Sequence, residues 1–179
     1  MMKELIRFLK IFVRKILKEN DMNILVVYYS LTNITRSVAE IFKENFSKKH
    51  SVTLFELKTD PEFKSNNIKK DFKIVQLPEL KGYDIVIVGG PVWAFGADFP
   101  ILKFLELVEN AEEKEFILFV TMAFPFKWMG GIRALSMMEK ILKEKDVKVL
   151  EKFCINRMFK NVENEAKKVS ENILSLIRT

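Results

Sequence analysis

Cysteine and histidine are almost absent from this chain of 179 residues: Cys154 is the only cysteine and His50 the only histidine. A single cysteine can form neither an intramolecular disulfide nor a Cys-rich zinc cluster, and a single histidine excludes a site with two histidine ligands. We therefore expect no metal site, and a protein of the reducing cytoplasm. His50 lies in a polar stretch, residues 48–51, and we interpret it as a solvated turn residue.

Long apolar runs are missing as well. No segment approaches the roughly 20 uncharged apolar residues that a membrane span needs, and the N-terminus lacks the uninterrupted apolar core of a signal peptide. We expect neither an integral membrane protein nor one secreted by that route. Hydrophobic residues make up 49% of the chain and charged residues 30%, which is the composition of a folded protein rather than a disordered one.

The net charge of +6 is distributed unevenly. Residues 1–21 hold six basic and three acidic residues, whereas the rest of the chain holds 24 and 21. Half of the excess charge therefore lies in the first 21 residues. The remainder is close to balance, which disfavours nucleic-acid binding by the body of the protein.

Residues 1–18 combine an apolar stripe with a basic one, which predicts an amphipathic helix. We expect residues 1–21 to form this helix and residues 22–179 to form the globular domain. The helix suits packing against its own domain, a homodimer contact with a second copy, or peripheral binding to an anionic membrane surface, and the sequence leaves these alternatives open.

From Asn23 onward, short apolar runs alternate with helical patterns, as in a parallel sheet with crossover helices. Strands are expected at 24–29, 52–57, 85–88, 116–120 and 147–155. Helices are expected at 34–46, 101–108, 132–143 and 162–177. Residues 58–82 are polar and contain two prolines, so we expect irregular structure or one short helix there.

Charge distinguishes central strands from edge strands. The first, third and fourth runs carry no charge, as strands covered on both faces should. Glu56 interrupts the second run, and Lys148, Glu151 and Lys152 interrupt the fifth, which is typical of edges. With right-handed crossovers, this pattern predicts an α/β three-layer sandwich whose five-stranded parallel sheet has the order 2-1-3-4-5.

In such a sheet, ligands bind beyond the carboxyl ends of the strands. The loop after the first strand carries three hydroxyl residues, Ser30, Thr32 and Thr35, at the start of a helix with unpaired N–H groups. That combination suits a phosphate dianion, without a lysine. The alternative is that Ser30 or Thr32 simply caps the helix.

The loops after the third and fourth strands, residues 89–100 and 121–131, gather rare residue types. They contain or adjoin five of the six glycines and both tryptophans, Trp93 and Trp128. Glycine permits close backbone approach, and loop aromatics offer flat apolar faces, so together they indicate a slot for a planar ligand. Alternatively, the aromatic residues merely cover the end of the sheet.

These segments resemble the flavodoxin family. Residues 24–40, with the run from Tyr29 to Thr35, resemble the loop that binds the phosphate of FMN. Residues 83–93 resemble the second flavin loop, and residues 119–121 followed by Gly130 and Gly131 resemble the third. The resemblance spans about residues 23–178 and implies a flavodoxin-like fold with one FMN bound non-covalently.

The resemblance also implies which residues bind FMN. The phosphate would be held by Ser30, Thr32, Asn33, Ile34 and Thr35. One side of the isoalloxazine would be lined by Pro91, Val92, Trp93 and Ala94. The loop beginning at Thr121 would close the other side, with Phe124, Phe126 or Trp128 stacking on the ring.

Two positions depart from the family pattern. Asn33 replaces a glycine usual in the phosphate loop, and asparagine tolerates left-handed backbone angles better than most residues. Ala94 lies near a position where flavodoxins often have glycine, and its Cβ would penalise a positive φ by about 1 kcal/mol. We therefore expect poor stabilisation of a one-electron-reduced flavin.

No side chain stands out as a general acid or base, so no catalytic residue is predicted. The chain is basic, whereas electron-carrier flavodoxins are typically acidic, so its redox partner should present a different surface. We expect a flavodoxin-like redox protein that passes electrons between a partner protein or a small-molecule acceptor and its FMN. The alternatives are an FMN-dependent NAD(P)H oxidoreductase acting on a quinone or similar acceptor, and a flavin-free interaction module.

Overall fold

A computed structural model describes residues 21–63, 72–112, 114–158 and 161–177 of the chain. Strands and helices alternate along it, as the sequence predicts. The strands are β1 (Asn23–Tyr28), β2 (Ser51–Glu56), β3 (Thr59–Asp60), β4 (Lys73–Ile74), β5 (Ile85–Trp93), β6 (Gly96–Ala97), β7 (Glu115–Met122) and β8 (Lys148–Asn156). The helices are α2 (Ile34–Phe46), α3 (Phe99–Leu107), α4 (Gly131–Lys143) and α5 (Val162–Leu176).

The five long strands form a parallel sheet in the order β2-β1-β5-β7-β8. Numbered along the chain, these strands have the predicted order 2-1-3-4-5. β1, β5 and β7 are almost fully buried along the sheet, whereas most residues of β2 and β8 are partly exposed. The placement of charged runs at the edges is therefore confirmed.

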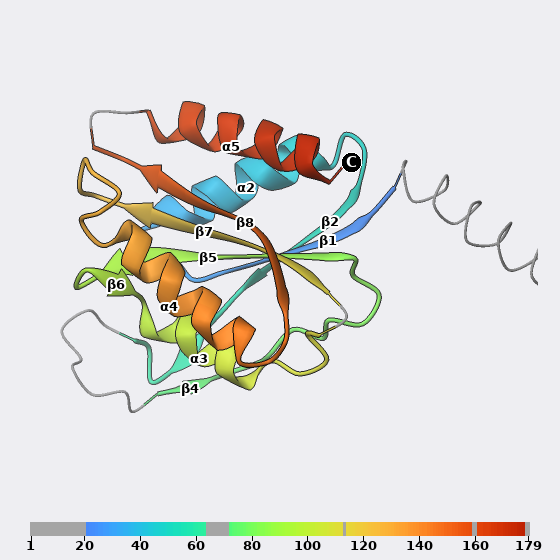
Figure 1. Cartoon of the computed structure of the whole chain (residues 1–179), viewed down its shortest axis with the longest axis horizontal. Coiled ribbons are helices and arrows are strands. Elements are labelled where there is room, and N and C mark those ends of the chain that lie inside the picture. The colour runs from blue at the N-terminus through green and yellow to red at the C-terminus, as the bar shows by residue number, and fades with distance from the viewer. Residues whose placement is uncertain (1–20, 64–71, 113, 159–160, 178–179) are drawn as a thin grey trace, which may run out of the picture.

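Helices cover both faces of the sheet, with α2 and α5 on one face and α3 and α4 on the other (Figure 1). Alternate residues of β5 enter the two cores, because successive side chains of a strand point to opposite faces. Ile85 and Ile87 pack in the core beneath α2 and α5. Val86 and Val88 pack in the core beneath α3 and α4. The result is the expected three-layer sandwich.

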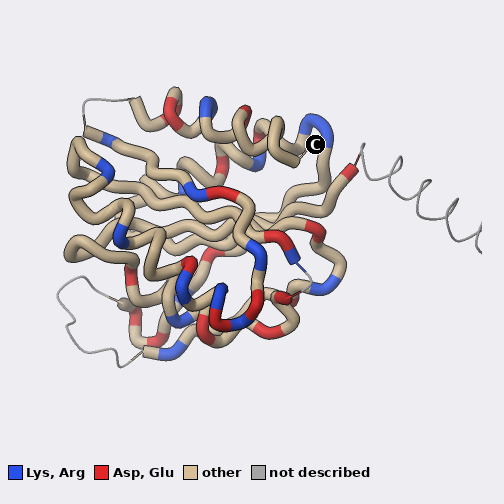
Figure 2. The backbone as a smooth tube through the Cα atoms, viewed as in Figure 1, with Lys and Arg blue, Asp and Glu red and all other residues tan. Residues whose placement is uncertain are grey.

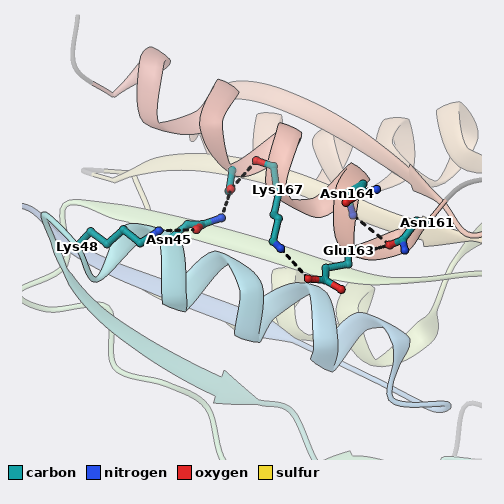
Figure 3. A network of polar contacts seen from close by, with 7 residues as sticks. Asn45, Lys48, Asn161, Glu163, Asn164 and Lys167 are labelled. Atoms are coloured by element: carbon teal, nitrogen blue, oxygen red, sulfur yellow. Dashed lines mark hydrogen bonds and ion pairs between the residues drawn. The ribbon is translucent and has the colours of Figure 1, made fainter.

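A polar network holds α2 against α5 (Figure 3). The amide of Asn45 donates to the Ser170 hydroxyl over 2.7 Å, and that hydroxyl donates to the Lys167 carbonyl over 2.7 Å. At the start of α5, the Asn161 side chain accepts the main-chain N–H groups of Glu163 and Asn164. The bond between Asn45 and Ser170 joins the last turn of α2 to α5, and the other bonds order α5 itself.

The segment between β2 and β5 differs in detail from the prediction. Most of its described residues are irregular, as predicted, but they include a short antiparallel pair, β3 with β4. The sheet also gains β6, which pairs antiparallel with the end of β5. Both pairings involve strands of two residues, which are too short to produce a recognisable alternation of polar and apolar residues.

The interpretation of His50 as a solvated turn residue is wrong. Only 7% of His50 is exposed, and its Nδ1 accepts the main-chain N–H of Met22 over 3.3 Å. The turn after α2 packs against the chain entering β1, which the local polarity of residues 48–51 does not reveal. His50 is therefore buried although its sequence neighbours are polar.

The proposed amphipathic helix at residues 1–18 lies outside the described residues, which begin at residue 21, and its alternatives stay predictions. Within the described ranges, no helix combines the length and apolar content needed to cross a membrane. In the same ranges, no three His, Cys, Asp or Glu side chains gather as metal ligands would.

Candidate functional site

Four loops meet beyond the carboxyl ends of the parallel strands, and a small cavity of about 90 Å³ opens between them. It is lined by Leu31, Thr32, Ile34, Pro91, Val92, Trp93, Thr121, Met122, Ala123 and Arg157. The lining includes residues from each of the three predicted ligand loops. It also includes Arg157, from the turn after β8, which sequence analysis missed.

The first loop enters α2 through a left-handed residue. Asn33 has φ 61° and lies in the left-handed region, so the residue that replaces the usual glycine does adopt this conformation. No side chain caps α2 from Asn33. Instead, the Ser30 hydroxyl accepts the N–H of Arg36 over 3.3 Å, so the capping alternative holds in part for Ser30. Thr32 is exposed and lines the cavity.

Thr35 links the first loop to the third. Its hydroxyl oxygen lies 2.9 Å from that of Thr121, and both residues are buried. In such a pair one hydroxyl donates to the other, so the acceptor keeps its own proton for a third group. The sequence predicted both residues as FMN contacts, and the structure brings them together at the base of the site.

The second loop is mostly strand. β5 continues through Gly89, Gly90 and Pro91 to Trp93, then pairs with β6 through a two-residue turn. A Cβ on Gly89 would overlap the ring of Phe119, and one on Gly90 would overlap the carboxyl of Asp98. These two glycines are therefore needed for internal packing, which accounts for them without a ligand, and their part in a ligand slot stays a prediction.

The turn between β5 and β6 is built from Ala94 and Phe95, which both have positive φ, 43° and 61°. Paired positive φ values are those of a type I′ hairpin turn, usually formed by Asn and Gly. A Cβ in this region costs about 1–2 kcal/mol per residue. Ala94 therefore already has the positive φ whose steric cost the sequence analysis expected.

The aromatic residues of the third loop are exposed and stacked in pairs. Phe124 stacks on Phe95 with ring centroids 5.5 Å apart, and Phe126 stacks on Trp128 at 6.0 Å. Gly130, at φ 106°, lets this loop approach the turn, because a Cβ there would come within 2.9 Å of the Phe95 Cα. Phe124, Phe126 and Trp128 do not line the cavity, and which of them would face a flavin stays a prediction.

Asn156, at the end of β8, fixes the third loop and was not predicted. Its side-chain amide donates to the carbonyls of Phe124 and Pro125, both over 2.7 Å, and its Oδ1 accepts the N–H of Met158 over 2.7 Å. The rule that ligands bind beyond strand ends applies to β8 as well. Extending it to the edge strand would have pointed to Asn156 and Arg157.

Asp98 is a buried carboxyl behind the second loop. It caps α3 by accepting the N–H of Ile101 on Oδ1, and its Oδ2 has no hydrogen-bond partner among the described residues. Burial raises the pKa of Asp98 to about 8, although the bond from Ile101 opposes this shift. Asp98 in turn adds to the effect of burial on Tyr29, whose pKa rises to about 12. Neither residue lines the cavity.

Arg157 is the one charged residue among the described residues that line the cavity. Arg36, in the first turn of α2, is engaged by Glu56 through two short contacts, 2.5 and 2.7 Å. Arg157 forms no ion pair with a described residue, and its main-chain N–H is anchored to the Met122 carbonyl at 3.0 Å. Arg157 is therefore the guanidinium available to an anion in the cavity.

The residues present fit a phosphorylated flavin in a specific way. A cavity of about 90 Å³ is far below the roughly 300–1,000 Å³ of sites that enclose a whole organic ligand. Its size and donor set, with a helix start, hydroxyls and one arginine, suit a phosphate group. The ring system would have to lie at the mouth, beside the exposed aromatic residues.

No family model and no curated protein matches the sequence. Among solved structures, the chain is similar to a presumed flavoprotein from Bacteroides eggerthii, with 19% identity, a TM-score of 0.65, and 88% of this chain and 99% of that one covered.

Two further solved structures are similar to this chain over very different shares of their own length. Oxidised flavodoxin 1 from Bacillus cereus has 13% identity and a TM-score of 0.60, over 87% of this chain and 96% of that one. Rubredoxin oxygen:oxidoreductase from Desulfovibrio gigas has 14% identity and a TM-score of 0.59, over 87% of this chain and 36% of that one. Strand order, layers and structural neighbours together show that this chain has the flavodoxin-like fold.

Proposed function

We propose that the protein is a redox protein that binds one FMN non-covalently and passes electrons through it. The main support is the cavity at the carboxyl end of the sheet, where Thr32, Trp93 and Thr121 come together from three loops. Its place matches the position at which ligands bind in sheets of this order. The flavodoxins among the structural neighbours support a flavin as the ligand.

The first loop would hold the phosphate. The start of α2 at Ile34 and Thr35 offers main-chain N–H groups and the positive end of the helix dipole. Thr32 adds an exposed hydroxyl, and the Thr35–Thr121 pair adds one further proton. Arg157 supplies a full positive charge and two parallel donors, which neutralises the dianion more effectively than hydroxyls alone.

The second and third loops would orient the ring. Residues Pro91 to Ala94 would flank one side, and the loop from Thr121 to Trp128 the other. FMN, when bound, accepts electrons from a donor and returns them to an acceptor. The chain's own contribution is to fix the ring in one orientation and to cover it with apolar side chains. The single cysteine and its raised thiol pKa, caused by burial, suit a reducing cytoplasm and no thiol chemistry.

The first experiment is an absorbance spectrum of the purified protein, followed by reconstitution with FMN. Flavin bands that co-elute with the protein would support the proposal. A colourless protein that ignores added FMN would contradict it and favour a flavin-free interaction module. Direct oxidation of NAD(P)H by the loaded protein would instead favour the oxidoreductase alternative.

The second experiment tests the phosphate site. Arg157→Ala should weaken FMN binding about tenfold or more, the usual effect of losing one charge-assisted hydrogen bond. Riboflavin, which lacks the phosphate, should bind the variant and the unmodified protein equally. Arg133→Ala, at an exposed arginine that does not line the cavity, is the matched control and should leave both affinities unchanged.

A further inference from the structure

The third loop and the first turn of α4 expose five neighbouring side chains beside the candidate flavin site. Phe126, Trp128 and Ile132 are 57%, 72% and 55% exposed, and Lys127 and Arg133 are exposed as well. We call these five residues the basic-aromatic patch. Six of the ten exposed large hydrophobic residues in the described chain lie at this end of the sheet, so the patch is part of a concentration of apolar surface, not a stray residue.

The patch is held in shape before anything binds. Phe126 and Trp128 stack at an interplanar angle of 10°. The Met129 N–H donates to the Phe126 carbonyl over 2.9 Å, and the Ile132 N–H donates to the Lys127 carbonyl over 3.0 Å. Rigid aromatic side chains lose little freedom on association, which is why tryptophan is enriched among residues that dominate interface energies.

The patch is also positively charged. Among the described residues, neither Lys127 nor Arg133 forms an ion pair, and the loop from 123 to 130 contains no Asp or Glu. In Figure 2, the loop between β7 and α4 carries blue and no red. An approaching surface would therefore need negative charge to match it.

We propose that the basic-aromatic patch is the docking site for an acidic redox protein that exchanges electrons with the flavin, an inference that rests on the proposed function. The five side chains protrude and none lines the cavity, so they suit a protein surface better than a nucleotide. Ala123 of the same loop does line the cavity, so a partner seated on the patch lies next to the mouth of the site.

The electron balance of this exchange is simple. In each encounter a reduced one-electron carrier loses one electron, and the bound FMN gains it. Two encounters, with protons taken from solvent, reduce the FMN fully. Electron-transfer encounters use small, transient interfaces, so a docking site centred on five side chains suffices. Its charge would act mainly on the rate of encounter, and hence would be sensitive to salt.

The test uses an acidic plant-type [2Fe–2S] ferredoxin as the probe. Stopped-flow kinetics would measure electron transfer from the reduced ferredoxin to the FMN-loaded full chain. We expect the second-order rate to fall about tenfold or more between low salt and roughly 0.3 M salt. Lys127→Glu combined with Arg133→Glu should lower the low-salt rate by a similar factor and abolish the fall with salt.

The matched control is Lys49→Glu combined with Lys81→Glu. It makes the same change in net charge at two exposed lysines near the amino ends of β2 and β5, on the opposite end of the sheet. The control should retain most of the rate and its dependence on salt. Trp128→Ala should weaken ferredoxin binding, measured by calorimetry on the flavin-free protein, because it removes apolar contact area and leaves the net charge unchanged.

Several outcomes would overturn the proposal. Equal effects of the two charge reversals would show that net charge acts without a docking site. Rapid reduction by NADPH that depends on Lys127 and Arg133 would assign the patch to a nucleotide. Self-association abolished by the patch reversal would assign it to a second copy. Because calorimetry needs no flavin, patch-dependent ferredoxin binding by a protein that fails to retain FMN would refute the proposed function and leave the docking surface standing.

Discussion

Thr35 and Thr121 are 86 positions apart in the chain, yet their hydroxyl oxygens lie 2.9 Å apart beneath the candidate flavin site. Thr35 belongs to the first turn of α2 and Thr121 to the end of β7. Their contact joins the loop assigned to the phosphate to the loop assigned to the ring. A buried hydrogen bond thus connects the two halves of the site.

Replacing either threonine with valine should destabilise the fold by about 1–3 kcal/mol, because each single variant leaves a buried hydroxyl without its partner. The double variant should cost less than the sum of the two, since it removes both hydroxyls. Urea unfolding of the four proteins measures the coupling, which should be about 1 kcal/mol. Strictly additive costs would show that the two hydroxyls do not depend on each other.

Much of this fold could be predicted from the sequence because local patterns and tertiary packing agree. The helix predicted at residues 34–46 has the same limits in the structure, since its apolar spacing and the left-handed Asn33 both mark its start. The uncharged runs became central strands and the charged runs became edges. In these elements, the residues that the sequence pattern marks as apolar are the ones that the fold buries.

The site could be predicted only in part, because its remaining features depend on contacts between distant segments. Gly89 and Gly90 suggested a ligand loop, but Phe119 and Asp98 require them inside a strand. Asn156 and Arg157 follow an edge strand that carried no motif. No local pattern reports which carbonyls Asn156 reaches, or that Arg157 borders the same cavity as Thr32.

The packing role of Gly89 leads to a second prediction. Gly89→Ala should destabilise the protein by about 1–3 kcal/mol or more, because the added methyl overlaps the buried ring of Phe119. Gly82→Ala is the control: it has open space but a φ of 85°, so it should cost about 1 kcal/mol. Chemical unfolding compares the two, and Phe119→Leu should partly rescue Gly89→Ala. The FMN affinity of the folded Gly89→Ala protein should change little. A loss of FMN affinity without a loss of stability would show that Gly89 serves ligand binding.

The turn at Ala94 and Phe95 yields a third prediction. Ala94→Gly should stabilise the protein by about 1 kcal/mol, because glycine adopts φ 43° without the steric cost of a Cβ. Ala123→Gly is a matched control in the third loop, where φ is not positive, and it should be neutral or destabilising. Thermal or urea unfolding in the absence of flavin distinguishes them. Equal effects of the two substitutions would contradict the presence of strain in the turn.

The buried carboxyl of Asp98 makes stability depend on pH in a direction opposite to that of most carboxylates. Its folded pKa of about 8 lies above the usual aspartate pKa of 3.8, so between these values the folded protein holds a proton that the unfolded chain has released. Stability from this group is complete below about pH 4 and is lost as the pH rises towards 8, at up to about 1.4 kcal/mol per pH unit.

Asp98→Asn should remove this dependence while keeping the cap on α3, because its side-chain oxygen still accepts the N–H of Ile101. The buried amide brings an extra N–H donor, so the variant should be no more stable than the unmodified protein at pH 5. At pH 9, where the unmodified protein carries a buried charge without a partner on Oδ2, the variant should be the more stable of the two. Urea unfolding at both pH values measures the difference, and parallel losses in the two proteins would show that Asp98 is already ionised at pH 5.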